Sequence, residues 1–275
     1  MSKRKQLSVL PGFRLSLSYT LTWMCVLLVL PLAACLMKTG SLSGAEFWKA
    51  VWTDRARAAY SLTFGVSFAA AVIDTVLGLL LAWVLVRYPF YGRRLMDSLI
   101  DLPFALPTAV AGLVYSNLYV KNGWLGQFLV PLGIQGAYSR LAIVLVLSFI
   151  GLPFVVRTVQ PVLESLDADI EEAASCLGAT RLQTFFRVIL PALYPALLTG
   201  FTLTFARALG EYGSVVFVSG NMPFKTEIAP VLIVSRLEEF AYAEATAIAV
   251  VLLAISFVLL GFINFLERRN QQRSA

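Results

Sequence analysis

Two ionisable residues, Arg207 and Glu211, lie four positions apart inside an apolar stretch of this 275-residue chain. On a helix this spacing puts both side chains on one face, where they can pair and remain neutral together. The planar guanidinium of an arginine is also a fork of donors that suits a tetrahedral oxyanion. We therefore expect Arg207 and Glu211 either to form a structural salt bridge or to line an anion path or its gate.

Three further candidates are found among the polar residues of the apolar stretches, namely Asp74, Thr108 and Ser116. Asp74 has no basic residue near it in the sequence, and we expect it to make a partnered helix–helix contact rather than to touch a substrate. A proton-coupling role is weaker still, because the chain has no histidine to share a relay. Thr108 and Ser116 offer hydroxyls to a passing anion, although hydroxyls in membrane helices also satisfy backbone carbonyls.

Other chemistry is excluded by what the sequence lacks. Without histidine, the chain has no His-ligated haem, HExxH zinc site or Ser-His-Asp triad. Cys25, Cys35 and Cys176 are too scattered for a disulfide framework or a metal site. No G-x-x-x-x-G-K-[ST] motif is present, so the chain itself does not hydrolyse nucleotide. We expect no catalytic residue, metal or cofactor in this chain.

A polar segment between two apolar stretches carries five of the sixteen acidic residues, namely Glu164, Asp167, Asp169, Glu171 and Glu172. Asp169 and Glu172 have the D-x-x-E spacing of a capping box, which predicts that a short helix begins here. The apolar stripe of this helix would be Ile170, Ala173, Ala174 and Leu177. Gly178 suits the position just past its end.

A second short helix should follow directly. Thr180 and Gln183 form another capping box, and Pro191 is expected to close the segment. The apolar stripe of this second helix would be Leu182, Phe185, Phe186 and Ile189. This hairpin is too short and too polar to span a membrane, and its small alanines permit close approach by another backbone. It is therefore suited to docking into a groove on a partner.

Composition identifies the elements that must position these residues. Apolar residues make up 59% of the chain and charged residues 14%, and the mean hydropathy is +0.78, which indicates an all-α polytopic membrane protein. The net charge of +6 is better explained by anionic lipid than by nucleic acid. Six spans are predicted, at about Leu17–Met37, Leu62–Val86, Ala105–Tyr119, Leu141–Val159, Leu193–Val218 and Ala245–Phe265.

The first and third spans are unusual. The third is short and opens with Pro103 and Pro107, which a first helical turn tolerates. The first ends in Leu32-Ala33-Ala34-Cys35, which resembles a lipoprotein cleavage box. However, its 21 residues exceed the apolar core of a signal peptide, which is about 7–15 residues, so we expect it to remain as a span.

The distribution of Lys and Arg predicts the orientation. Segments 1–16, 87–98, 157–190 and 267–275 hold 13 basic residues, and the alternating segments 38–60, 121–140 and 218–244 hold 8. Because positive loops stay inside, both termini are expected in the cytoplasm of a multi-pass protein in a bacterial inner membrane.

The acidic hairpin carries a family resemblance. Glu172-Ala173-Ala174, three residues, Gly178, nine residues and Val188-Ile189-Leu190-Pro191 resemble the EAA loop of ABC importer permeases, with Val188 in place of the usual isoleucine. The resemblance implies that an ATPase subunit grips this loop. The residues it assigns to that coupling contact are Glu171, Glu172, Ala173, Ala174, Leu177 and Gly178.

The likeness extends over nearly the whole chain. Runs 102–112, 151–161 and 205–214, together with the opening 11–17, resemble the T-type subunit of sulfate/thiosulfate ABC permeases. That family implies a type I importer (MetI-like) core of five helices plus an added N-terminal helix. It also implies a W-type sister permease, two ATPase subunits that bind the ATP and magnesium, and a periplasmic sulfate-binding protein.

The expected organisation has three parts. Residues 1–55 would form a tail, the first span and a periplasmic loop; residues 56–266 the transmembrane domain, with the coupling loop at 160–191; and residues 267–275 a cytoplasmic tail. Three alternatives remain open: a molybdate or tungstate permease, a proton-coupled secondary anion transporter, and a membrane-embedded enzyme. The secondary transporter would be favoured by inverted repeats with interrupted helices, and no convincing repeat is visible.

Overall fold

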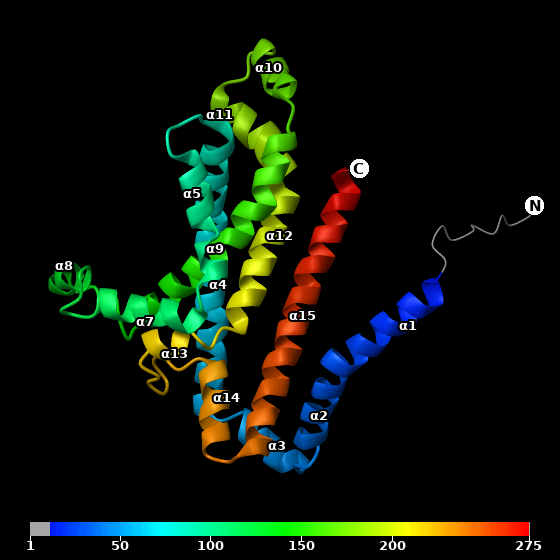
Figure 1. The fold of residues 1–275 in the computed structure, drawn as a ribbon, viewed down its shortest axis with the longest axis vertical. Coiled ribbons are helices and arrows are strands. Elements are labelled where there is room, and N and C mark those ends of the chain that lie inside the picture. The colour runs from blue at the N-terminus through cyan, green and yellow to red at the C-terminus, as the bar shows by residue number, and fades with distance from the viewer. Residues whose placement is uncertain (1–11, 275) are drawn as a thin grey trace, which may run out of the picture.

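A computed structural model describes residues 12–274 of the chain, and every regular element there is helical (Figure 1). The basic residues Lys3, Arg4 and Lys5 and the start of the 11–17 run lie outside the described residues. The longer helices are α1 (Phe13–Met24), α2 (Leu30–Thr39), α3 (Gly44–Val51), α4 (Asp54–Arg87), α5 (Arg93–Ile100), α7 (Thr108–Tyr119), α9 (Arg140–Ser165), α10 (Ala168–Cys176), α12 (Leu190–Leu209), α14 (Ala229–Glu238) and α15 (Tyr242–Ser274). The short ones are α6 (Leu102–Ala105), α8 (Gly126–Leu129), α11 (Arg181–Thr184) and α13 (Val215–Val218), with π-helical turns at Cys25–Val29 and Phe185–Ile189 and a 3₁₀ turn at Val130–Leu132.

Five helical runs of the described residues are long and apolar enough to cross a membrane: Phe13–Thr39, Asp54–Arg87, Arg140–Ser165, Arg181–Leu209 and Tyr242–Phe265. They correspond to five of the six predicted spans, and all five are longer than predicted because polar residues at their ends are also helical. Two begin at side-chain caps, where the hydroxyl of Thr53 accepts from the backbone of Ala56 and that of Ser139 accepts from Ala142.

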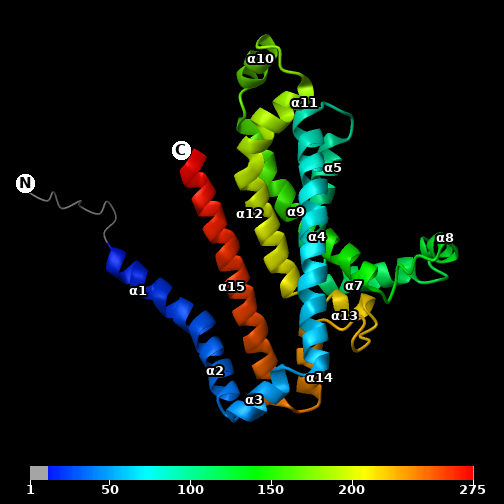
Figure 2. The same ribbon diagram turned by 180° about the vertical axis from the view of Figure 1, so that it is seen from behind.

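The third predicted span, Ala105–Tyr119, is not a continuous span. The chain here forms α5, α6 and α7, and α7 has only 12 residues, a length of about 18 Å. The break falls at Leu106, whose ψ of 133° is extended, because Pro107 disfavours a helical conformation in the residue before it. Helix α7 therefore projects sideways from the upright helices, with α8 beyond it (Figures 1 and 2).

The fifth predicted span is shifted toward the N-terminus. Its helix runs from Arg181 to Leu209 without a stop, so Pro191 does not close the hairpin as predicted. The π-helical turn Phe185–Ile189 directly precedes α12, whose first turn contains Pro191. The wider π turn accommodates this proline, which has no backbone N–H to donate. At the other end the helix stops at Leu209, since Gly210 caps it and a loop leads to α13.

The centre of the molecule is a bundle of α4, α9 and α12, which bury two apolar clusters between them. Glycines allow the helices to approach closely: a Cβ on Gly78 of α4 would lie 2.7 Å from the side chain of Val155 in α9. A Cβ on Gly200 of α12 would lie 2.9 Å from the Cα of the same valine. Within a membrane the hydrophobic effect does not drive helices together, so the close packing that small residues permit stabilises their association instead.

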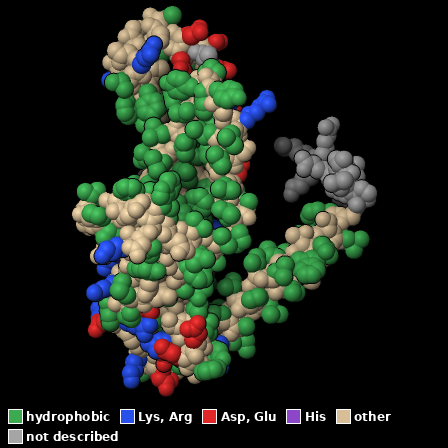
Figure 3. Space-filling view, turned by 60° about the vertical axis from the view of Figure 1, so that its left-hand side comes forward, with side chains coloured by type: hydrophobic (Ala, Val, Ile, Leu, Met, Phe, Trp, Pro, Cys, Tyr) green, Lys and Arg blue, Asp and Glu red, His purple; other side chains and the backbone are tan. Residues whose placement is uncertain are grey.

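The N-terminal helix stands apart from this bundle. In the run Phe13–Thr39 the most apolar window has no buried residue, and only its α2 end packs against α15. Figures 1 and 2 show α1 diverging from α15, and both the start of α1 and the end of α15 point toward the end of the molecule that carries α10. On the face in Figure 3, hydrophobic side chains cover the middle, and most charged ones gather toward the two ends.

Candidate functional site

Helix α10 projects at one end of the molecule, between α9 and α11 (Figure 1). The predicted capping box of Asp169 and Glu172 is wrong: α10 begins at Ala168 after Asp167, whose side chain makes no capping hydrogen bond. Asp169 and Glu171 instead lie in the first turn, where negative charge is stabilised by the unpaired N–H groups.

The end of α10 is as predicted. Gly178 has a φ of +82°, and Ala179 donates its N–H to the carbonyl of Ala174 at 3.0 Å while Gly178 donates to Ser175 at 2.9 Å, a Schellman motif. The predicted capping box at Thr180 and Gln183 is confirmed, with both reciprocal hydrogen bonds formed. The angle between α10 and α11 is therefore fixed by one left-handed glycine and one side-chain cap.

The outer surface of α10 is open. Leu177 is 89% exposed and Ile170 46%, and Glu172 and Ala173 are exposed, whereas Ala174 is half-buried. Exposed large apolar side chains lie beside a carboxylate on a projecting helix, a combination that is typical of protein interaction surfaces. The residues predicted for coupling thus lie together, with one exception.

That exception is Glu171, which faces the chain's own membrane helix. Its carboxylate forms an ion pair with Arg87, the last residue of α4, and the guanidinium lies 5.5 Å from the centroid of the Trp83 ring. The sequence prediction missed Arg87 because 84 residues separate it from Glu171. Its place in the basic segment 87–98 predicted only a cytoplasmic location.

The second group of predicted residues surrounds the loop that follows α12. Arg207 donates from Nη1 to Oε2 of Glu211 at 2.6 Å, as the spacing predicts, although Glu211 lies beyond the end of the helix. Oε1 of Glu211 accepts from both the N–H and the hydroxyl of Ser214, at 2.9 and 3.0 Å. The Glu211 side chain is 3% exposed and that of Arg207 38%, so the carboxylate is buried while the arginine side chain is partly open to its surroundings.

The same loop packs against the first turns of α7. A Cβ on Gly213 would lie 2.4 Å from the hydroxyl oxygen of Thr108, and one on Gly112 would lie 2.2 Å from the carbonyl oxygen of Ser214. Thr108 is half-buried, and the side-chain hydrogen bonds of the described residues do not engage its hydroxyl. The structure therefore brings Arg207, Glu211 and Thr108 to one place.

Ser116 is not part of that arrangement. It lies two turns further along α7, is 6% exposed, and donates its hydroxyl proton to the Tyr138 hydroxyl at 3.2 Å. An engaged, buried hydroxyl offers nothing to a passing anion in this conformation.

Among the ion pairs that were not predicted, two are held by hydrogen bonds from more than one guanidinium nitrogen. Arg157 in α9 donates from Nε and Nη2 to both carboxylate oxygens of Asp101, at 2.8 and 2.7 Å, and from Nη1 to Asp97 at 2.7 Å. Arg55 at the start of α4 holds Glu227, which is 2% exposed, by two hydrogen bonds of 2.8 and 2.6 Å. The i, i+4 spacing of Asp97 and Asp101 is the sequence signal that could have indicated the first cluster.

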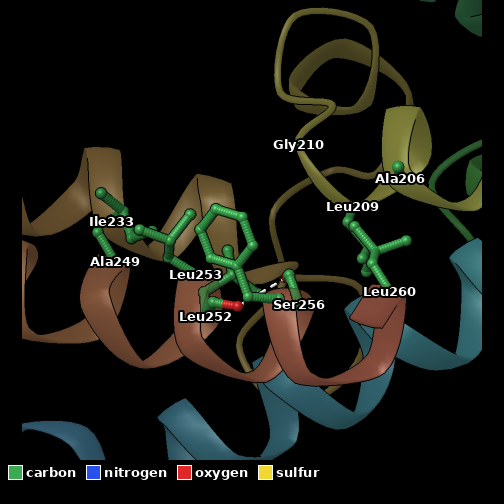
Figure 4. Close-up of a pocket in the computed structure, with 10 residues that line it drawn as sticks. Ala206, Leu209, Gly210, Ile233, Ala249, Leu252, Leu253, Ser256 and Leu260 are labelled. Atoms are coloured by element: carbon green, nitrogen blue, oxygen red, sulfur yellow. Dashed lines mark hydrogen bonds between the residues drawn. The ribbon is translucent and has the colours of Figure 1, made fainter. Parts of the chain in front are cut away.

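An apolar pocket opens beside the loop, between α12, α14 and α15 (Figure 4). Its residues include Ala206 and Gly210, and it also contains Ser256, whose hydroxyl donates to the carbonyl of Leu252 at 2.7 Å. A dianion would find neither a cation nor a free donor among the side chains lining this pocket. Within the described residues there is also no group of three His, Cys, Asp or Glu side chains placed to hold a metal.

The chain was compared with protein families, with individual relatives and with solved structures, and the three comparisons agree with one another. Residues 74–272 match the family model described as the binding-protein-dependent transport system inner membrane component. The sulfate transport system permease proteins CysT of Salmonella typhimurium and Escherichia coli are 51% and 49% identical over 265 residues, which is 96% of this chain and 96% of each relative. A bacterial ABC transporter that imports alginate has a chain with the same fold, with a TM-score of 0.77 at 17% identity over 93% of this chain and 94% of that one.

Proposed function

The chain belongs to the family of binding-protein-dependent transport system inner membrane components, and we propose that it is a permease subunit of an ATP-driven importer of sulfate and thiosulfate. The observation that supports sulfate is the identity of about half of all residues to sulfate permeases over 96% of the chain. Because the match includes both α10 and the Arg207 loop, it covers the two regions on which transport would depend.

The direction of transport requires an energy source. Sulfate is a dianion, and moving it into a negative cell costs about 2.3 kcal/mol per charge per 100 mV, so about 4.6 kcal/mol before any concentration gradient. A chain without a nucleotide-binding motif must obtain this energy from a partner. We infer that two ATPase subunits, which bind the ATP and magnesium, occupy the cytoplasmic side, and that this chain is non-catalytic and binds no cofactor itself.

The projecting hairpin that contains α10 would be the docking site for the ATPase. Leu177 and Ala173 would enter a groove on the ATPase, and Glu172 would meet a basic residue at its rim. Closure of the ATPase dimer would then push α10, and the Arg87–Glu171 pair would carry this push to α4. Tilting of the helix bundle would switch the pathway between inward-open and outward-open states.

The anion pathway is proposed to pass the Arg207 loop. Nη1 of Arg207 donates to Glu211, and because the arginine side chain is 38% exposed, its other N–H donors would remain for an oxyanion. The hydroxyl of Thr108 lies across the loop as a neutral donor. Because the Arg207–Glu211 pair is neutral overall, it would bind a dianion only weakly. Weak binding lets the ion move on through the pathway. Ser116 would contribute only if α7 moves and releases Tyr138.

The assembly would comprise this chain, a W-type sister permease, the two ATPases and a periplasmic sulfate-binding protein in a bacterial inner membrane. With α10 cytoplasmic, both termini would also be cytoplasmic, since α1 begins and α15 ends toward the α10 end of the molecule (Figure 1). A reporter that is active only in the cytoplasm should then be active when fused after Ala275. A reporter that is active only in the periplasm should be inactive at the same position.

Uptake of radiolabelled sulfate into liposomes that contain the purified complex tests the proposal. We expect uptake that needs both the binding protein and ATP on the α10 side, with competition by thiosulfate. Stronger competition by molybdate than by thiosulfate would favour the molybdate permease alternative. Uptake driven by a proton gradient without ATP would contradict an ABC importer.

A further inference from the structure

The carboxyl group of Asp74 lies where α4, α9 and α12 meet. The residue is 0% exposed, and a Cβ on Gly151 of α9 would lie 2.4 Å from its Oδ2 and 2.5 Å from Cγ2 of Thr204 in α12. The absence of a side chain at Gly151 therefore makes room for the carboxyl group. Thr204 completes the junction by donating its hydroxyl proton to the carbonyl of Gly151 at 3.1 Å.

The predicted helix–helix contact of Asp74 is present, but the predicted partner is not. Neither carboxylate oxygen has a hydrogen-bond partner among the described residues. The hydroxyl of Ser148, one turn before Gly151, lies beside the carboxyl group at a geometry short of a hydrogen bond and is itself without a partner. Two unsatisfied polar groups thus adjoin each other on α4 and α9.

Among the described residues of these three helices, no cation lies beside Asp74 to compensate a charge on it. Arg140, which donates to the carbonyl of Lys225, begins α9 eleven residues before Gly151, a separation of about 16 Å. Helix α4 has no basic residue between Arg57 and Arg87, each at least 13 residues from Asp74, a separation of about 20 Å. On α9, Arg157 is bound by Asp97 and Asp101, as described above. On α12, Arg207 is bound by Glu211.

An ionised carboxylate that is fully buried, with no cation or hydrogen-bond donor of the protein bound to it, is far less stable than the same group with a proton bound. We propose that Asp74 is a protonated, neutral carboxylic acid that holds α4 against α9 and α12 by hydrogen bonding to Ser148. A carboxylic acid has one O–H donor and a free acceptor, so a small rotation of the Ser148 hydroxyl satisfies both groups. Asp74 is then a positioning residue whose proton stays in place, not a carrier that couples transport to a proton gradient.

Infrared spectroscopy of the purified complex tests this protonation state without depending on the transported anion. The difference spectrum between the wild type and Asp74→Asn should contain a carboxylic-acid C=O band that shifts in heavy water. Ser148→Ala should move that band to higher frequency, because the acid loses its hydrogen bond. Absence of the band from both difference spectra at neutral pH would mean that Asp74 is ionised and would overturn the proposal.

Transport distinguishes a neutral positioning group from a charge-bearing one. Asparagine has the shape of a neutral aspartic acid and keeps a donor and an acceptor, so Asp74→Asn should retain uptake within about twofold and leave its pH profile unchanged. Asp74→Leu, of similar size without hydrogen-bonding groups, should lose most of the uptake. Loss of uptake in an assembled Asp74→Asn complex would show that the charge is needed and would refute the proposal.

Discussion

The guanidinium of Arg87, the last residue of the 34-residue helix α4, forms an ion pair with Glu171 in α10. The ring of Trp83, one turn earlier, lies beside the guanidinium and restricts it further. A short hairpin joined to the membrane helices only by its two chain connections would absorb a push from outside. The ion pair and the edge-to-face contact between the rings of Trp83 and Phe185, with centroids 5.4 Å apart, join it to α4 as well, and we propose that a displacement of α10 reaches α4 through them.

Breaking the Arg87–Glu171 pair should therefore lower the coupling of ATP hydrolysis to uptake more than it lowers the free energy of unfolding. The side chains are 23% and 33% exposed, so the pair contributes about 1 kcal/mol, or roughly a fivefold effect. We expect Arg87→Gln and Glu171→Gln each to lower sulfate uptake per ATP hydrolysed, and the exchange of both charges to restore part of it. If the two single variants and the charge exchange all changed the rate of ATP hydrolysis by the same factor and left uptake per ATP unchanged, this result would argue against a mechanical link.

Gly178 should be required for its backbone conformation rather than for space. Its φ is +82°, and a Cβ built there meets nothing within 4 Å. A β-branched residue is strained in this conformation by about 1–2 kcal/mol, whereas asparagine tolerates it. We predict that Gly178→Val uncouples ATP hydrolysis from uptake by about tenfold. Gly178→Asn is the matched control and should retain coupling; normal uptake in the valine variant would contradict the proposal that α10 transmits closure of the ATPase dimer.

Arg207 requires a double variant to separate stability from transport. Arg207→Ala alone leaves the buried Glu211 carboxylate without its cation, at a cost of about 3 kcal/mol in folding stability. Adding Glu211→Gln removes that charge while keeping an acceptor for Ser214, so thermal stability should largely return. We expect uptake to remain lost in the stable double variant. Wild-type uptake there would exclude Arg207 from the anion path.

The contact between α7 and the Arg207 loop should tolerate no side chain at Gly112. A Cβ would lie 2.2 Å from the backbone carbonyl oxygen of Ser214, and a backbone atom cannot rotate away. Gly112→Ala should therefore cost about 1–3 kcal/mol and reduce uptake roughly tenfold or more. Gly65→Ala on an exposed face of α4, where a Cβ meets nothing within 4 Å, is the control and should be neutral or slightly stabilising.

Arg157 should hold the broken third segment against the bundle. Its fork binds Asp101 through two nitrogens, a geometry that lysine cannot reproduce. Because these side chains are 32–45% exposed, we expect Arg157→Ala to lower the unfolding free energy by about 1–2 kcal/mol and Arg157→Lys by less. Thermal unfolding of the purified complex measures both. An equal loss in the two variants would mean that the bidentate geometry contributes nothing.

The sequence predicted most of the helices well because their signals are local. Long apolar runs specify a membrane span wherever they lie, and a cap such as Thr180 with Gln183 depends on residues within one turn. Gly178 was identifiable for the same reason, since a helix end needs a left-handed residue at a fixed position. The errors also have local causes: Pro107 breaks the third span, and Gly210 ends the fifth early enough to leave Glu211 in a loop.

The sequence by itself thus determined an all-helical membrane protein with an exposed acidic hairpin and a paired Arg207 and Glu211. Only the tertiary structure decided that Arg87 restrains Glu171 and that Asp74 meets Gly151 without a cation beside it. The reason is physical. A helical span or cap is stabilised by neighbours in sequence, whereas the partner of a charge is set by how helices pack, and that packing joins residues up to 84 positions apart in these two cases.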